Sequence, residues 1–426
     1  MTQTVEMVPR RESQRRGRAP KRRAGSPQPG SSKDAGLVEA LIQPAALCAY
    51  ENGNAAVVEE SLRRLDDDRL LERHVAFAVV GAWCHAYSGR PEQAERWFRT
   101  AERAADEYDS DLPDGSRSVS SWLAVLRAGL CREGPEQMRA DSEQALEELA
   151  ATSIWRPDAH YLLGCASHLL GDDGVAEREW NVVLEMARTS GANPLAAQVL
   201  GQLALLALDR GDVSTAAELL ATAQELPGPP FGSHVAHGVP VAALARLSLA
   251  ESDREAARRW ILRAKTLRPL HTWALPCRAV QVRLELANVA AALLDDLGCR
   301  TLLVEIKEIE SHRPALGTLV DGITRLTAQV ELFRTSSWNW AASLTPAELG
   351  LLPVLATYLT LEEIAQRFLL SRHTVKAQAA AIYRKLHATS RSQAVERAVE
   401  LGLLGRTVLL PQPGAERDRL RPHATH

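Results

Sequence analysis

The sequence predicts an all-α protein, in which a helical-hairpin solenoid precedes a small domain of four helices. Apolar residues recur with helical spacing from about residue 34 onward, and alternating runs of β-branched residues are scarce. A turn motif returns at intervals of about 40 residues along the first part of this region. Several helix-start signals then crowd into residues 344–404.

Composition is that of a globular protein with several domains. The 426 residues leave room for two to four domains of roughly 100–200 residues each. No run approaches the ~20 apolar residues of a membrane span, and the basic N-terminus lacks the apolar core of a secretory signal. We therefore expect a cytoplasmic protein with no membrane contact. The cysteines are far apart and are expected to be reduced core residues rather than zinc ligands or disulfides: Cys48, Cys84, Cys131, Cys165, Cys277 and Cys299.

Both ends of the chain are predicted to be disordered tails, residues 1–33 and 405–426. The first holds nine Lys or Arg against two Glu, is rich in Pro, Gly and Ser, and shows no apolar periodicity. Gly25 and Gly30 have the spacing of a phosphate-binding loop, but Lys33 does not follow the second glycine directly. We take that match as chance.

Residues 34–334 are predicted to form the solenoid. The repeated motif is a helix-breaking residue, polar residues suited to a helix start, and a small anchor five positions on, as in Gly89 to Ala94. The residues four and seven positions beyond each anchor share its helix face. This pattern resembles tetratricopeptide repeats, although those recur every 34 residues or so. The anchors, spaced by 44, 38, 40 and 41 residues, are Ala94, Met138, Ala176, Ala216 and Ala257. The copy at Met138 is weaker, because its turn is one residue shorter.

Residues 335–343 interrupt the pattern and are predicted to be a linker to a four-helix domain at 344–404. Only Leu369, Leu370 and Ser371 separate its second and third helices, which is the spacing of a helix-turn-helix. Helices are expected near 346–357, 361–368, 372–387 and 391–401. Capping boxes at Thr345/Glu348, Thr360/Glu363 and Ser390/Gln393, and an N-cap at Ser371, mark their starts.

The third helix divides into two faces. Val375, Ala379, Ile382 and Leu386 share one face, expected to pack on Ile364, Ala365 and Phe368 of the second helix and Ala394, Val395 and Ala398 of the fourth. The opposite face carries His373, Ala377, Ala380 and Arg384, flanked by Thr374 and Lys376. Alanines let this face approach another surface closely, and the cations, with Arg384 and Lys385 at the far end, suit phosphates.

Five short motifs follow one another in residues 344–404: L-T-P-x-E, E-I-A-x-R, L-S-x-x-T-V-K, R-K-L and S-R-S-x-A-V. In their order and spacing they resemble the C-terminal DNA-binding domain of the LuxR family of bacterial transcription regulators. The resemblance implies a domain that dimerises through its last helix on inverted-repeat double-stranded DNA. It also implies that Lys376, Ala377 and Ala380 face base edges, and that Arg372, Thr374, Arg384, Lys385 and Arg391 lie near phosphates.

Some residues depart from the family pattern. Pro353 falls inside the first helix and is expected to bend it. His387 replaces a common glycine after the third helix, at a position that often needs a left-handed backbone. The solenoid and the domain together resemble the C-terminal part of large ATP-binding LuxR regulators. The chain shows no ATPase module, so we expect no ATP and no other cofactor.

No catalytic arrangement is recognisable, and we expect neither enzymatic activity nor a metal site. His234 and His237 have metal-like spacing without a nearby acidic or Cys partner. The tryptophans at helical spacing are expected to be core or groove walls: Trp83, Trp97, Trp122, Trp155, Trp180 and Trp260.

These observations favour a sequence-specific DNA-binding transcriptional regulator, a homodimer on DNA. Its solenoid would bind an unknown small-molecule or protein effector that controls the C-terminal domain. The alternative is an adaptor, whose solenoid docks to another regulator while DNA contact is weak. The net charge of −3 divides into +7 for the N-terminal tail, +2 for residues 344–404, +2 for the C-terminal tail and −14 for the rest. An acidic solenoid between basic ends leaves DNA contact to those ends.

Overall fold

A computed structural model of the chain describes residues 55–107, 112–357, 359–368, 370–400 and 403–404. Within these ranges the ordered elements are α-helices and three short 3-10 turns, without a strand. The all-α fold class is thus confirmed. The predicted tails, 1–33 and 405–426, lie outside the described residues.

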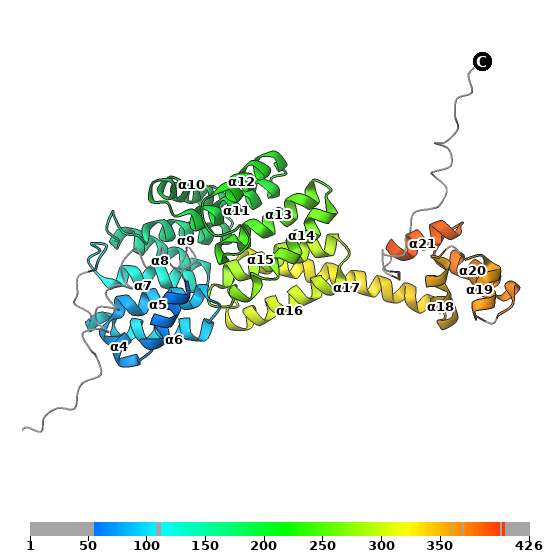
Figure 1. The fold of residues 1–426 in the computed structure, drawn as a ribbon, viewed down its shortest axis with the longest axis horizontal. Helices are drawn as coiled ribbons and strands as arrows, with labels where there is room; N and C mark the ends of the chain where they lie inside the picture. Colours follow the sequence, from blue (N-terminus) through cyan, green and yellow to red (C-terminus); the bar gives the residue numbers. More distant parts are fainter. Residues whose placement is uncertain (1–54, 108–111, 358, 369, 401–402, 405–426) are drawn as a thin grey trace, which may run out of the picture.

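Helix pairs stack side by side to form the solenoid (Figure 1). The pairs are α5–α6, α7–α8, α9–α10, α11–α12, α13–α14 and α15–α16, and the two members of each pair pack closely along their length. Their bounds, with the two helices that precede them, are α3 Ala55–Arg64, α4 Asp68–Arg73, α5 Val75–Tyr87, α6 Pro91–Ala104, α7 Val119–Leu130, α8 Pro135–Glu148, α9 Arg156–Leu169, α10 Asp173–Ser190, α11 Asn193–Asp209, α12 Val213–Glu225, α13 Gly238–Ala250, α14 Arg254–Ala264, α15 Pro276–Ala292 and α16 Asp296–His312. The short 3-10 turns are Ala105–Glu107, Val235–His237 and Arg268–Leu270.

The repeated turn motif marks the start of the second helix in each of the first five pairs. The anchors predicted from the sequence are all at most 2% exposed. Positions four and seven residues further on are also buried, except Ile261, which is half-buried. The helix-breaking residues adopt positive φ, which explains why glycine recurs there: Gly89, Gly134, Gly171, Gly211 and, in the fifth copy, Ser252.

A sixth copy of the motif, which the sequence analysis missed, opens α16. Leu294 has φ +62 and occupies the place of the glycine. Asp295 caps the helix by accepting from the Gly298 N–H, as Asp172, Asp212 and Asp253 do in their own turns. Cys299, 1% exposed, takes the anchor position. Because Leu and Cys stand where Gly and Ala were expected, this copy was not recognised in the sequence.

Tryptophans fill the contact between paired helices where a glycine makes room. A Cβ added at Gly81 would lie 2.0 Å from the Trp97 ring, and one at Gly164 would lie 2.4 Å from Trp180. Trp97 and Trp180 are at most 1% exposed. These rings are therefore core residues, as their helical spacing predicted.

The end of the solenoid packs back against its beginning. The Arg313 guanidinium, after α16, lies 2.8 Å from the Glu95 carboxylate of α6. Arg313 also stacks over Trp273, with 5.1 Å between the guanidinium carbon and the ring centroid. A Cβ on Gly317 would lie 2.2 Å from the Leu169 carbonyl oxygen of α9. Segments more than 140 residues apart in sequence thus close the superhelix on itself.

Helix α17, Thr318–Ser343, leads from the solenoid to the C-terminal helices (Figure 1). Residues 335–343, predicted to interrupt the helical pattern, are instead part of this helix. The polar residues and two tryptophans of this segment break the apolar spacing, but none of them prevents a helix from continuing. The C-terminal helices have a hydrophobic cluster of their own, separate from that of the solenoid. Their bounds are α18 Pro346–Leu355, α19 Leu361–Phe368, α20 Arg372–Lys385 and α21 Arg391–Glu400.

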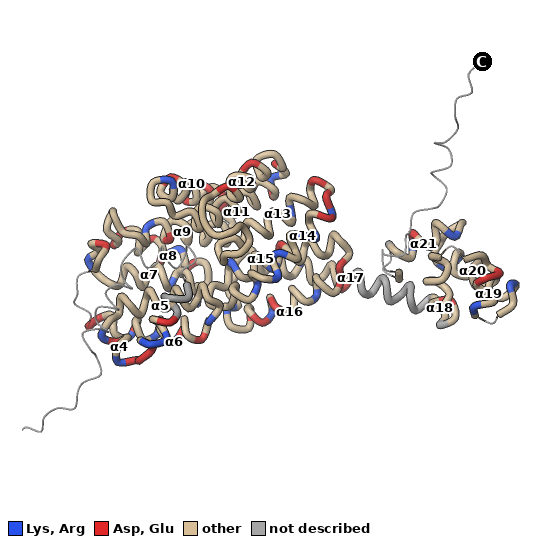
Figure 2. Tube along the Cα trace, viewed as in Figure 1, with Lys and Arg blue, Asp and Glu red and all other residues tan. Residues whose placement is uncertain are grey.

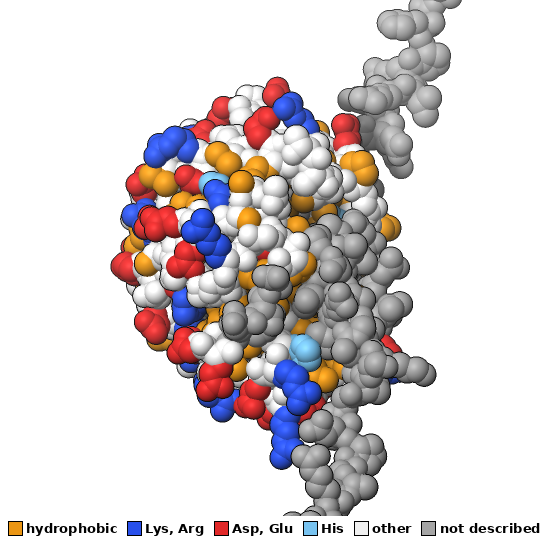
Figure 3. Space-filling model, turned by 90° about the vertical axis from the view of Figure 1, so that its left-hand side faces the viewer, with side chains coloured by type: hydrophobic (Ala, Val, Ile, Leu, Met, Phe, Trp, Pro, Cys, Tyr) orange, Lys and Arg blue, Asp and Glu red, His pale blue; other side chains and the backbone are white. Residues whose placement is uncertain are grey.

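Charges on the solenoid are mixed (Figure 2). At its N-terminal end, acidic and basic side chains are interspersed with uncharged ones over the part that grey atoms do not cover (Figure 3). Arg96 of α6, for example, pairs with Asp66 and, at 3.4 Å, with Asp68. Among the described residues, no helix combines the length and apolar character needed to cross a membrane.

Candidate functional site

Side-chain caps define the helices of the C-terminal domain. The Thr345 N–H donates to Glu348 Oε2 at 2.6 Å, and the Glu348 N–H donates back to Thr345 Oγ1 at 3.3 Å. Thr360 and Glu363 form the same reciprocal pair, with the same two distances. Both predicted capping boxes are confirmed, and they set where α18 and α19 begin.

The caps of α20 and α21 differ from each other. Ser371 Oγ accepts from the Thr374 N–H at 3.0 Å, which confirms the predicted N-cap. Ser390 Oγ accepts from the Gln393 N–H at 3.2 Å, but the Gln393 side chain accepts from the Thr389 N–H instead of from Ser390. The third predicted box is therefore only half formed.

The buried face of α20 is the one predicted. Val375, Ala379, Ile382 and Leu386 are at most 2% exposed, and they join one cluster with the predicted residues of α19 and α21, apart from Phe368. Phe368 is 38% exposed, so its assignment to the core was wrong. It is the last residue of α19, at the turn, where few neighbouring elements remain to cover a large side chain.

The opposite face of α20 is open to solvent. His373, Ala377, Ala380 and Arg384 are exposed, as is Lys376 at its flank. Arg372, at the helix start, is exposed and lies 3.5 Å from Glu362 of α19. Thr374 is half-buried, its hydroxyl 2.7 Å from that of Ser371. Small side chains in the middle and cations toward both ends give a surface that can approach a polyanion closely.

Lys385 is engaged within the domain. Its Nζ lies 2.6 Å from Glu348 Oε2, in the capping box of α18. Burial acts to raise the pKa of Glu348, but hydrogen bonds from Lys385 and Thr345 outweigh it and hold that pKa below its usual value. This ion pair joins the end of α20 to the start of α18.

Arg391 is engaged more fully. Its guanidinium donates to the carbonyl oxygens of Leu355 at 2.6 Å, Leu359 at 2.7 Å and Thr357 at 2.7 Å, and to Val354 at 3.4 Å. These carbonyls belong to the end of α18 and the connection to α19, where helical partners are lacking. One side chain thus ties α21 to the segment that precedes α19.

The backbone at His387 has the left-handed conformation expected from the sequence, with φ +51. The helix α20 therefore ends on a non-glycine residue that tolerates this region better than most. Pro353 lies inside α18, which ends at Leu355 rather than near residue 357.

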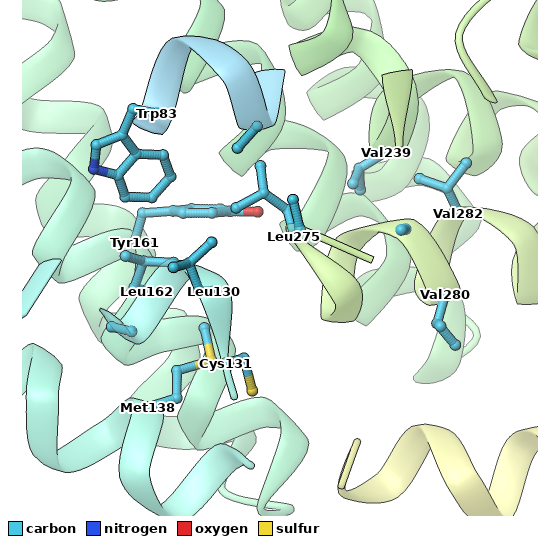
Figure 4. Packing of buried hydrophobic residues seen from close by; sticks show 14 of the residues in the cluster. Trp83, Leu130, Cys131, Met138, Tyr161, Leu162, Val239, Leu275, Val280 and Val282 are labelled. Atoms are coloured by element: carbon cyan, nitrogen blue, oxygen red, sulfur yellow. The ribbon is translucent and has the colours of Figure 1, made fainter. Parts of the chain in front are cut away.

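A cavity lies inside the solenoid, and its residues were not singled out in the sequence. It leaves about 50 Å³ of free volume between residues of α5, α7, α8, α9, α10, α11 and α15 and the turn before α15. Trp83, Tyr161, Leu162 and Leu275 belong to its apolar lining and gather in one part of the core (Figure 4). Asp158 and Arg278 bring charges into it. The available signal was the presence of charged residues, Arg278 among them, in the otherwise mostly apolar sequence of α15, 276–292.

The pH dependence of stability is expected to change in Asp158→Asn. Burial raises the pKa of Asp158 to about 7, against a smaller opposing effect of its own backbone and Arg278. The folded state therefore holds the proton more tightly than the unfolded chain, and wild-type stability falls as the pH rises from about 4 through 7. Above pH 7, Asp158→Asn is expected to exceed the wild type by an amount on the order of 3 kcal/mol. Denaturant unfolding at pH 5 and pH 8 measures this; an equal difference at both values would contradict it.

His234 and His237 serve the backbone of their own loop. His234 Nδ1 accepts from the Ala236 N–H at 3.2 Å, and His237 Nδ1 accepts from the Gly232 N–H at 3.1 Å. Burial lowers the pKa of each imidazole to about 4, which keeps both neutral and able to accept. Their spacing is explained by a short 3-10 turn that His234 caps.

Comparison with known proteins identifies one segment of the chain. Residues 342–398 match the family described as bacterial regulatory proteins, luxR family. The match begins at the end of α17 and covers α18, α19, α20 and most of α21. It includes the capping boxes, the turn and the exposed face of α20.

No curated protein matches the chain as a whole or in part. Among solved structures, the crystal structure of BtubC (BKLC) from P. vanneervenii is 18% identical, with a TM-score of 0.26. That match covers 61% of this chain and 90% of the BtubC chain.

Proposed function

We propose that this chain, whose residues 342–398 form a helix-turn-helix domain of the luxR family, is a sequence-specific transcriptional regulator controlled through its solenoid. The observation that carries the DNA-binding part is the face of α20, where exposed alanines lie between cations. A helix with such a face can enter the major groove, with its small residues against the bases.

Within this proposal the residues of α20 divide by position. Lys376, Ala377 and Ala380 contact base edges, and His373 lies beside them on the same face. Arg372, Thr374 and Arg384 contact phosphates. Lys385 and Arg391, also candidates from the sequence, are already held by Glu348 and by backbone carbonyls. Their support for DNA binding is therefore indirect, through the shape of the domain.

The bound form proposed is a homodimer on an inverted-repeat site. One domain of this size contacts a short stretch of DNA, and two copies related by a two-fold axis double the sequence that is read. The last helix, α21, is the proposed dimer contact, since it carries exposed side chains at Ser392, Gln393 and Glu396.

The solenoid is proposed to bind the effector, and the cavity supports a small molecule in preference to a protein. Its lining combines aromatic walls with a few polar groups, which is typical of small-ligand sites, and its free volume of about 50 Å³ suits only a small ligand. Occupancy there would act on α15, whose neighbour α17 leads to the DNA-binding domain.

Lys376→Ala is expected to weaken binding to a selected duplex by roughly 5- to 100-fold, with loss of discrimination at the contacted base. Arg384→Ala is expected to weaken binding to all duplexes alike. It is also expected to reduce the slope of log affinity against log salt concentration by about one, because one fewer phosphate is neutralised. Fluorescence anisotropy with a duplex enriched by the wild-type chain measures both. The matched control is Lys307→Ala, an exposed lysine of α16. Unchanged affinity in both α20 variants, with unchanged circular dichroism, would refute the proposed interface.

A further inference from the structure

The cavity of the solenoid contains an arginine, Arg278, in which two of the three guanidinium nitrogens make no hydrogen bond to a described residue. Arg278 of α15 is only 9% exposed. Its Nη1 donates to Gln198 Oε1 of α11 at 2.6 Å. Its Nε and Nη2 are buried and make no hydrogen bond to any described residue. A buried cationic donor without an acceptor is unfavourable, so this side chain indicates a missing partner.

The unused atoms form one edge of the guanidinium. Nε–H and Nη2–H point the same way and are spaced to bind both oxygens of a carboxylate. Gln198 holds the remaining Nη1, and the Tyr87 ring lies 5.2 Å below the guanidinium carbon. These two contacts fix the plane of the guanidinium, and its unpaired edge belongs to a residue that lines the cavity.

Other polar groups of the cavity are largely satisfied. Gln202 and Gln281 exchange two hydrogen bonds, of 2.9 and 2.8 Å, across α11 and α15. His168 Nδ1 lies 2.6 Å from Asp173. Arg278 is the one Lys or Arg among the residues that line the described cavity. A single cation suits a monoanion, whereas a phosphate dianion calls for more positive charge.

The acid of the cavity, Asp158, does not pair directly with Arg278. No ion pair within 4.0 Å joins them, and burial holds the pKa of Asp158 near 7. The carboxyl is therefore partly protonated at neutral pH and leaves Arg278 short of a counter-charge. When protonated, it can also donate a hydrogen bond to a ligand.

We propose that this cavity binds a small monocarboxylic acid with an aromatic or aliphatic body, its carboxylate seated on the Nε–Nη2 edge of Arg278. The body packs against Trp83, Tyr161 and Trp180, which line the cavity. This inference deepens the proposed effector function and rests on it for its biological role. The binding itself does not depend on DNA.

The test is ligand-observed NMR on the full-length chain without DNA. The probes are small monocarboxylates of increasing size, from acetate through butyrate to phenylacetate, each beside its neutral amide. Acids are expected to bind in preference to their amides, since only the carboxylate pairs with Arg278. Arg278→Gln is expected to weaken acid binding by roughly 10- to 100-fold. Arg278→Lys keeps the charge but loses the planar edge, and it is also expected to bind at least several-fold more weakly.

Arg300→Gln, at an exposed arginine of α16, is the control and should leave acid binding unchanged. Amides that bind as well as acids, acid binding that persists in Arg278→Gln, or a panel without any bound acid would each overturn the inference. If Arg278→Gln fails to fold, the Arg278→Lys comparison decides. Duplex affinity is then measured with and without the best acid: a bound acid that leaves this affinity unchanged supports the site while refuting the effector role.

Discussion

Arg391→Ala is expected to lower the free energy of unfolding of the C-terminal domain by about 3–5 kcal/mol. Three carbonyl oxygens lie within 2.7 Å of this guanidinium, and hydrogen bonds from a charged donor contribute more than neutral ones. In the variant, carbonyls at the end of α18 lose their partner and α21 loses its tie to them. The free energy of unfolding of a domain this small is itself only a few kcal/mol, so a loss of this size would leave most of the domain unfolded.

Hydrogen exchange of the full-length chain measures this locally. Amides of α18 and α21 are expected to exchange much faster in Arg391→Ala, while those of the solenoid stay protected. DNA binding falls in consequence. Lys376→Ala is the matched comparison: it removes a cation from the same domain and should lose DNA binding with exchange unchanged. Wild-type exchange in Arg391→Ala, accompanied by weaker DNA binding, would instead make Arg391 a direct DNA contact.

Glu95→Ala is expected to destabilise the solenoid by about 3–5 kcal/mol, since it removes the common partner of three arginines. The Glu95 carboxylate lies 2.9 Å from Arg99, 3.3 Å from Arg132 and 2.8 Å from Arg313. Arg99 can turn to solvent, but the Arg313 side chain is 11% exposed and would be left beside Arg132 without a counter-charge. Burial already lowers the pKa of Arg313, against the opposing effect of Glu95.

Denaturant unfolding of the full-length chain tests the contact, with Glu92→Ala on the same helix as an exposed control. The control is expected to cost less than about 1 kcal/mol. Because Glu95 and Arg313 interact directly, the loss in the double variant Glu95→Ala/Arg313→Ala should be well below the sum of the single losses. Additive losses, or a Glu95→Ala loss no larger than that of the control, would show that this ion pair does not hold the superhelix closed.

The solenoid could be predicted because its turns repeat a backbone requirement. Positive φ favours glycine, and close helix packing favours alanine. The same two residue types, as at Gly171 and Ala176, therefore return in most of the turns. Where another residue accepts the same conformation, as at Leu294, the pattern is hidden. Closure of the superhelix could not be predicted, since the contact of Arg313 with Glu95 depends on the summed rotation of all the intervening pairs.

The candidate sites, too, could be predicted only where they depend on local sequence periodicity. The exposed face of α20 follows from helical periodicity alone, and Ala377 and Ala380 lie where that periodicity puts them. Periodicity does not say which cations are free, and Lys385 and Arg391 proved to be held within the domain. The cavity around Arg278 joins helices far apart in the sequence, so no local pattern could reveal it.

Selection of duplexes from a random-sequence pool by the purified full-length chain tests sequence-specific DNA binding by α20. The enriched duplexes are expected to share an inverted repeat. Lys376→Ala is expected to bind them more weakly than the wild type does at the same salt concentration. A pool without any shared sequence, bound equally by the wild type and Lys376→Ala, would contradict direct DNA readout by α20 and favour an adaptor that acts through its solenoid.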